Sequence, residues 1–239
     1  MSNFCHGFTT IDYDYVWAIN GLNLREEPNK NSKLIKKLQF GDSLKIVELT
    51  PFKFTNLLIR EAEPEKHPIY LKSNWVKVIA NGKEGYLIDG YLLDLPCPEI
   101  DEKINDYLTR MSNRFNTIRL QEKFPIKSGI INFKTNQIIF SNDKRIDFEE
   151  NKKDLKQNIS TESESDYVAE TFKYFRGFKL NEILVFLNPF IGLENKKDFE
   201  LKVRRNWKEM IWMTDGAMQE IELSMLKNGV IIFYYNASC

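Results

Sequence analysis

The sequence predicts a mainly β protein, in which a small β-barrel precedes one helix and a second, β-rich region that is antiparallel or of the α+β class. Short stretches of alternating apolar and polar residues recur along the chain, and turn-forming pairs such as Asn81-Gly82 and Asp89-Gly90 separate them. This pattern breaks at Leu95-Pro96-Cys97-Pro98, because closely spaced prolines suit neither a helix nor a central strand. We therefore expect a lead-in over residues 1–16, a barrel over 17–96 and a second domain over 97–239.

Strand and turn signals near the start of the segment predict the barrel. Leu22 and Leu24 alternate with Asn23 and Arg25, which is the period of a strand with one buried face. Gly41-Asp42 then supplies a turn. The lead-in also ends on an alternating aromatic stretch, which predicts an early first strand for the barrel.

Several short motifs in this region follow one another in an order typical of a known family. They are GLNLREEP from Gly21, FGDSLKI from Phe40, WVKV from Trp75, GKEGYL from Gly82 and GYL from Gly90. In these motifs the segment resembles the bacterial SH3-like (SH3b) domains. The resemblance implies an SH3-like barrel that binds a peptide, cell-wall or protein ligand, in an envelope, periplasmic or secreted protein. The stretch from Thr50 to Ser73 departs from it, because it is longer than the expected connection.

Three tyrosines are candidate ligand contacts. Tyr86 and Tyr91 belong to the motifs, and Tyr70 lies in the long connection that is expected at one rim. Amphipathic rings suit binding surfaces, although the same rings can serve the core and rim of a barrel. Trp75 is expected to be a core residue.

After the prolines, an apolar stripe at spacings of three and four predicts an amphipathic helix that Pro125 stops. The stripe consists of Ile100, Ile104, Tyr107, Leu108, Met111, Phe115 and Ile118.

The remaining residues predict an antiparallel meander. Lys134-Thr135-Asn136 is expected to turn between two strands, and Ser141–Asp166 to form an exposed polar loop. The apolar run Glu182–Asn188, which Pro189 follows, is expected to be a buried strand. Alternation over Phe199–Val203 and the apolar stretch Val230–Tyr235 indicate further strands.

Histidine content limits the chemistry. The chain has only His6 and His67, so residues 97–239 lack the base of a Cys-His peptidase and the usual ligand of a zinc amidase. No phosphate-binding glycine loop and no CxxC pair occurs. We therefore expect no catalytic residue, no cofactor and no metal site. The alternative is a carboxylate-dependent hydrolase in the second domain, which needs only two acidic side chains.

Charge balance and hydropathy limit the partners and the cellular locations that the sequence predicts. Lys+Arg and Asp+Glu balance at 34 each, which does not favour nucleic-acid binding. No apolar run has the roughly 20 residues of a transmembrane helix, and the N-terminus lacks the pattern of a signal peptide. If the resemblance holds, the natural precursor is expected to carry an export signal upstream or to start at another methionine; a cytoplasmic location is the alternative. Cys5 is expected to be a free cysteine rather than a lipidated one.

Overall fold

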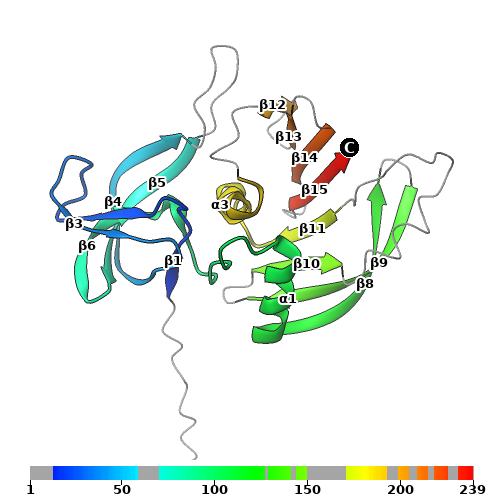
Figure 1. Ribbon diagram of the computed structural model, residues 1–239, viewed down its shortest axis with the longest axis horizontal. Coiled ribbons are helices and arrows are strands. Elements are labelled where there is room, and N and C mark those ends of the chain that lie inside the picture. Colours follow the sequence, from blue (N-terminus) through cyan, green and yellow to red (C-terminus); the bar gives the residue numbers. More distant parts are fainter. Residues whose placement is uncertain are drawn as a thin grey trace, which may run out of the picture. The chain divides into compact units, whose positions relative to one another are not determined.

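The computed structural model describes residues 13–58, 70–126, 129–140, 144–149, 171–192, 199–204, 209–214, 218–225 and 231–238 (Figure 1). The chain divides into two compact units. The first comprises Met1–Leu57 and Leu71–Pro98, and the second comprises Leu58–Tyr70 and Glu99–Cys239. Nearly all regular elements of both units are antiparallel strands, which confirms the mainly β fold class.

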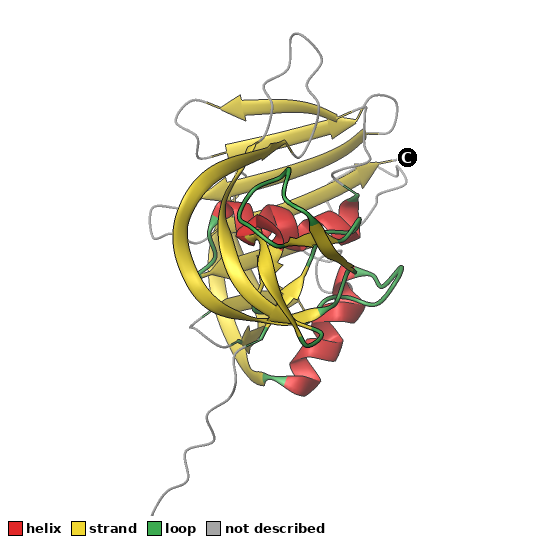
Figure 2. Ribbon diagram, turned by 90° about the vertical axis from the view of Figure 1, so that its left-hand side faces the viewer, coloured by secondary structure: helices red, strands yellow, loops and turns green. Residues whose placement is uncertain are grey.

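The first unit is built on one seven-stranded antiparallel sheet in the order β3-β2-β6-β5-β4-β1-β7. Its elements are β1 (Asp14–Val16), β2 (Leu22–Arg25), β3 (Leu34–Leu38), β4 (Ser43–Leu58), β5 (Tyr70–Ala80), β6 (Lys83–Ile88), the 3-10 turn η1 (Asp89–Tyr91) and β7 (Leu92–Leu93). The strands are strongly curved (Figure 2). In the part of the chain that the structure describes, no pairing joins the edge strands β3 and β7. The predicted barrel is therefore a curved, open sheet.

Apolar side chains on one face of this sheet form the core of the unit. Leu22 and Leu24 are buried while Asn23 is exposed, as their alternation predicts. The core cluster consists of Val16, Ala18, Leu22, Leu24, Leu38, Leu44, Val76, Val78, Ala80, Leu87 and Leu92. Trp17 is also fully buried, and its indole Nε1 donates a hydrogen bond to the Leu95 carbonyl at 2.8 Å.

Gly85 allows the backbone of β6 to lie close to the backbone of the neighbouring strand β2. A Cβ atom at this position would lie 2.7 Å from the Arg25 carbonyl oxygen and 2.9 Å from Cγ of Leu24. Only glycine allows the two backbones to approach this closely. The close approach sets the register in which Arg25 is paired with Tyr86.

The second unit contains an eight-stranded antiparallel sheet in the order β12-β13-β14-β15-β11-β10-β9-β8, which confirms the predicted meander. Its elements are α1 (Ile104–Arg114), β8 (Asn116–Ile126), β9 (Gly129–Ile139), β10 (Arg145–Glu149), β11 (Thr171–Arg176), α3 (Leu180–Ile191), β12 (Phe199–Arg204), β13 (Glu209–Thr214), β14 (Met218–Met225) and β15 (Ile231–Ser238). Within the described residues, a helix followed by four meandering strands occurs twice. The last strands of the two halves, β11 and β15, pair with each other.

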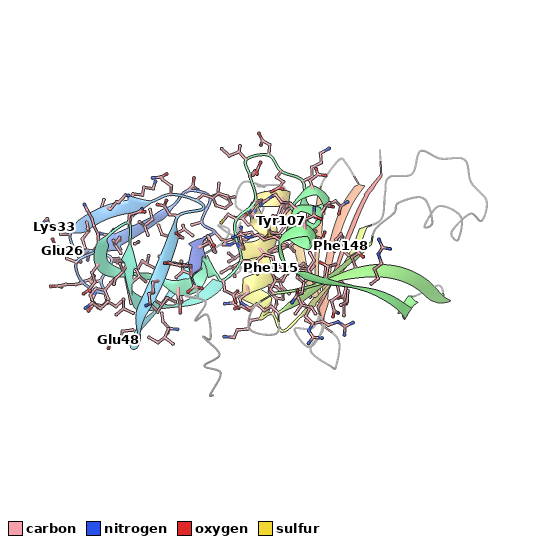
Figure 3. The ribbon with its side chains drawn as sticks, turned by 90° about the horizontal axis from the view of Figure 1, so that it is seen from below. Glu26, Lys33, Glu48, Tyr107, Phe115 and Phe148 are labelled. Atoms are coloured by element: carbon pink, nitrogen blue, oxygen red, sulfur yellow. The ribbon has the colours of Figure 1, made fainter. Side chains whose placement is uncertain are left out.

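Aromatic rings from both helices and from the sheet form the core of this unit. Phe186 of α3 lies 5.7 Å from Tyr107 of α1 and 5.5 Å from Phe175 of β11, as measured between ring centroids. Phe115, directly after α1, lies 5.0 Å from Phe140. Figure 3 shows Tyr107 and Phe115 on and beside α1, and Phe148 on the neighbouring sheet.

The predicted helix is too long at both ends. Ile100 precedes α1 and is 90% exposed. At the other end the Phe115 N–H donates to the Met111 carbonyl, after which the chain enters β8 with Ile118 in a strand. Pro125 lies inside β8, and this edge strand tolerates a residue that cannot donate a hydrogen bond.

Three further predictions are wrong. Glu182–Asn188 belongs to the helix α3 and is not a strand. Lys134-Thr135-Asn136 lies within β9, so the hairpin between β8 and β9 turns earlier in the chain. The supposed polar loop Ser141–Asp166 contains the strand β10, in which Ile146 and Phe148 alternate with charged residues and are buried. Residues 141–143 and 150–166 of that segment lie outside the described residues.

Candidate functional site

The register of the first sheet places four side chains in one row across four strands. Leu34 of β3 is paired with Arg25 of β2, Arg25 with Tyr86 of β6, and Tyr86 with Lys77 of β5. Directly opposed residues of antiparallel strands share one face of the sheet. The inward-facing neighbours Leu24 and Leu87 are buried, so this row lies on the outer face. We call Leu34, Arg25, Tyr86 and Lys77 the Tyr86 row.

The row combines apolar surface with basic groups. Leu34 is 48% exposed and Tyr86 is half-buried. Lys77 forms an ion pair with Glu84, and a hydrogen bond from its ammonium to that carboxylate raises the pKa of Lys77. Arg25 Nη1 donates to the Ser32 carbonyl at 2.5 Å. Arg25 and Lys77 therefore lie at the register positions on either side of Tyr86, and each has a polar partner of its own.

The loop beside the row is held by its own polar contacts. Lys33 Nζ and Glu26 Oε1 lie 2.8 Å apart, and Figure 3 shows the two side chains next to each other. The Ser32 hydroxyl accepts from the Glu27 N–H at 2.9 Å. These contacts, with that of Arg25, hold the loop between β2 and β3 against the end of the row.

The three predicted tyrosines occupy different environments. Tyr86 lies at the centre of the row. Tyr91 lies in η1, where it packs against the core cluster and its carbonyl accepts from the Trp17 N–H at 2.9 Å. Tyr70 begins β5, and its side chain lies outside the described residues. Trp75 is 6% exposed, as expected of a core residue.

Sequence reasoning missed Arg25, Lys77 and Leu34 as neighbours of Tyr86. All four residues lie within the predicted barrel, but their proximity depends on the pairing of strands that are far apart in the sequence. Gly85 is the signal that was available, because a glycine inside a strand indicates a close backbone approach.

Among the described residues of the second unit, the carboxylates of Glu102, Asp147 and Glu182 each form an ion pair with a basic side chain. Asp147 of β10 is fully buried; its Oδ1 accepts from Gln137 Nε2 at 2.6 Å and its Oδ2 from Arg176 Nε at 3.0 Å. Glu182 of α3 lies 3.3 Å from Lys144 Nζ and also accepts the Lys179 N–H. Each carboxylate thus has its own cation, whereas a glycosidase pairs two carboxylates across one bond.

Cys97 lies within the described residues and forms no disulfide. Its thiol donates to the Val16 carbonyl at 3.3 Å, and burial raises its pKa to about 12.

We expect the Cys97 thiol to react slowly with a disulfide reagent at about pH 8, because the thiolate is the reactive form. The variant with Cys5 and Cys239 replaced by serine isolates its signal, and urea-unfolded protein is the reference. Equal rates in folded and unfolded protein would contradict this assignment.

Residues 97–239 contain no histidine, and the two histidines of the chain are His6 and His67. His67 lies outside the described residues. Among the residues that the structure does describe, no group of three potential metal ligands occurs. None of the described helices is long and apolar enough to cross a membrane.

Residues 20–92 match the family model of the bacterial SH3 domain. The match begins just before β2 and ends in β7, so it includes every member of the Tyr86 row and confirms the resemblance drawn from the motifs. This part of the chain is a bacterial SH3 domain, which is a type of binding module. No curated protein and no solved structure matches the chain.

Proposed function

We propose that the bacterial SH3 domain of this chain binds a peptide, cell-wall or protein ligand of the bacterial envelope, and that the Tyr86 row is its contact surface. The observation that carries the proposal is the pairing of Tyr86 with a base on each side, Arg25 and Lys77. Tyr91 is assigned to supporting the core, because it packs against the core cluster.

The composition of the row suits a peptide-like ligand. A tyrosine ring offers an apolar face and a hydroxyl at a low cost in conformational entropy, and such rings often dominate binding energy. Leu34 adds exposed apolar surface at one end of the row. Arg25 and Lys77 can donate to backbone carbonyls or carboxylates of an extended ligand.

Replacing Tyr86 with alanine is expected to weaken retention on purified peptidoglycan or on an envelope protein partner. A contact residue at the centre of an interface contributes at least about 1 kcal/mol, which is roughly a fivefold loss of affinity. Co-sedimentation of the full chain with peptidoglycan, and pull-down from envelope extracts, measure the effect.

Tyr13→Ala is the matched control. Tyr13 is 46% exposed and precedes β1, outside the Tyr86 row, so its loss removes an aromatic ring of the same kind from another place. Equal loss of retention in both variants, or no loss in either, would refute the assignment of the row.

We also propose that the chain is not an enzyme. In the described residues, Asp147 and Glu182 are each paired with a cation, and Cys97 is held as a neutral thiol, which supports this proposal. The purified protein should therefore not hydrolyse peptidoglycan or glycan substrates. Turnover that disappears in Asp147→Asn or Glu182→Gln, with folding retained, would instead establish the carboxylate-dependent hydrolase.

The envelope location is part of the proposal. It is supported by the bacterial SH3 domain, a family that often occurs in envelope proteins. Fractionation of the source cells tests it: the protein is expected in the envelope, periplasmic or secreted fraction, and recovery only from the cytoplasm would refute this location.

A further inference from the structure

Two arginines of the second sheet are paired directly opposite each other. Arg145 of β10 is the register partner of Arg176 of β11. Directly opposed side chains have Cβ atoms about 4.5–5.5 Å apart, and like charges in this position destabilise a strand pair. The pairing is therefore unfavourable in the absence of a compensating anion.

Among the described residues, a carboxylate compensates only one of the two charges. Asp147, two residues along β10 on the same face, binds Arg176 through Oδ2 and Gln137 through Oδ1. Each of its two oxygens thus already accepts a hydrogen bond from another side chain. The Arg145 side chain is half-buried and makes no hydrogen bond or ion pair with any described residue. The side chain of Glu149, which lies further along β10 on that face, is outside the described part.

We propose that Arg145 and Arg176 form a binding site for an oxyanion, the phosphate or carboxylate group of a ligand. Guanidinium groups are planar forks that donate two parallel hydrogen bonds to such a group. An oxyanion between the two forks converts their repulsion into two attractive contacts. Arg176 remains 30% exposed, so the site is open to solvent. A local arrangement that costs stability is expected where it serves a function.

The proposal makes a paired prediction for the full chain. In low-salt buffer with chloride alone, Arg145→Gln is expected to raise Tm, because it removes the like-charge pair. Titration with inorganic phosphate, or with acetate, at constant ionic strength is expected to raise the Tm of the original protein but not that of Arg145→Gln. A response to phosphate alone identifies a phosphate group, and an equal response to acetate identifies a carboxylate.

Two further variants separate the geometry of the fork from the effect of net charge. Arg145→Lys keeps the charge and loses the planar fork, so its Kd for the anion is expected to rise roughly tenfold. Lys37→Gln removes one exposed positive charge from β3 in the other unit and should respond to the anion as the original protein does. The proposal is overturned if neither anion binds, or if Arg145→Gln binds as tightly as the original protein.

Discussion

Replacing Phe186 with alanine is expected to lower the free energy of unfolding by about 3–5 kcal/mol, through lost burial and the cavity left behind. The Phe186 side chain is fully buried in α3. It lies between rings from both helices and the sheet, at centroid distances of 5.7 Å to Tyr107, 5.5 Å to Phe175 and 5.4 Å to Phe190. Its removal therefore opens the place where three elements meet. Urea denaturation of the full chain measures the loss.

Two comparisons define this result. Phe186→Leu keeps most of the volume and is expected to cost less than the alanine substitution. Ile100→Ala truncates a 90% exposed side chain before α1 and is expected to change stability by no more than about 0.5 kcal/mol. If Phe186→Ala were as mild as Ile100→Ala, the aromatic cluster would not be the core of the second unit.

Phe186 also shows where sequence reasoning fails. Its burial was predictable from the continuous apolar run, but such a run has no period that separates a buried strand from a buried helix. The distinguishing signals lie at its ends. Glu182 accepts the Lys179 N–H at the start of α3, and Gly192, at φ +64°, ends the helix in the left-handed conformation. A glycine just past an apolar run is a helix-ending signal that outweighs Pro189 here.

The first unit was more predictable, because its signals are local. Turn pairs and alternation placed the strands, and the motifs identified the family. The hairpin expected at Lys134-Thr135-Asn136 failed because polar residues also occur inside a long strand whose pairing extends beyond them. Neither the Tyr86 row nor the Arg145–Arg176 pair was predictable, since both depend on register between distant strands. The sequence thus predicts elements better than it predicts sites.

The supposed loop Ser141–Asp166 gave the largest error of interpretation. Its charged composition gave no indication of the strand β10. In this strand Asp147 lies between the buried residues Ile146 and Phe148 and is itself fully buried. A charged residue in such a place requires partners, because a buried charge without them is costly. The structure supplies them as Gln137 and Arg176, from the strands on either side.

Asp147→Ala is consequently expected to be as destabilising as the loss of Phe186, by about 3–5 kcal/mol. It would leave the Arg176 guanidinium without its carboxylate and the buried Gln137 amide without its acceptor. Arg176 is 30% exposed and is partly screened by water, which favours the lower end of that range. Arg176→Ala leaves the fully buried carboxylate without its cation, so it is expected to be at least as costly.

A double-mutant cycle distinguishes a true pair from two unrelated losses. Asp147→Ala combined with Arg176→Ala removes both charges, so the double variant should be more stable than the sum of the single losses implies. The coupling free energy between contacting residues of this kind is about 0.5–3 kcal/mol. Urea denaturation of the four proteins measures it, and strictly additive losses would show that the Asp147–Arg176 contact does not stabilise the second sheet. The same cycle tests the role of Arg145. The double variant lacks Arg176, so Arg145 no longer faces a second arginine. Adding Arg145→Gln to the double variant should therefore not raise its stability further.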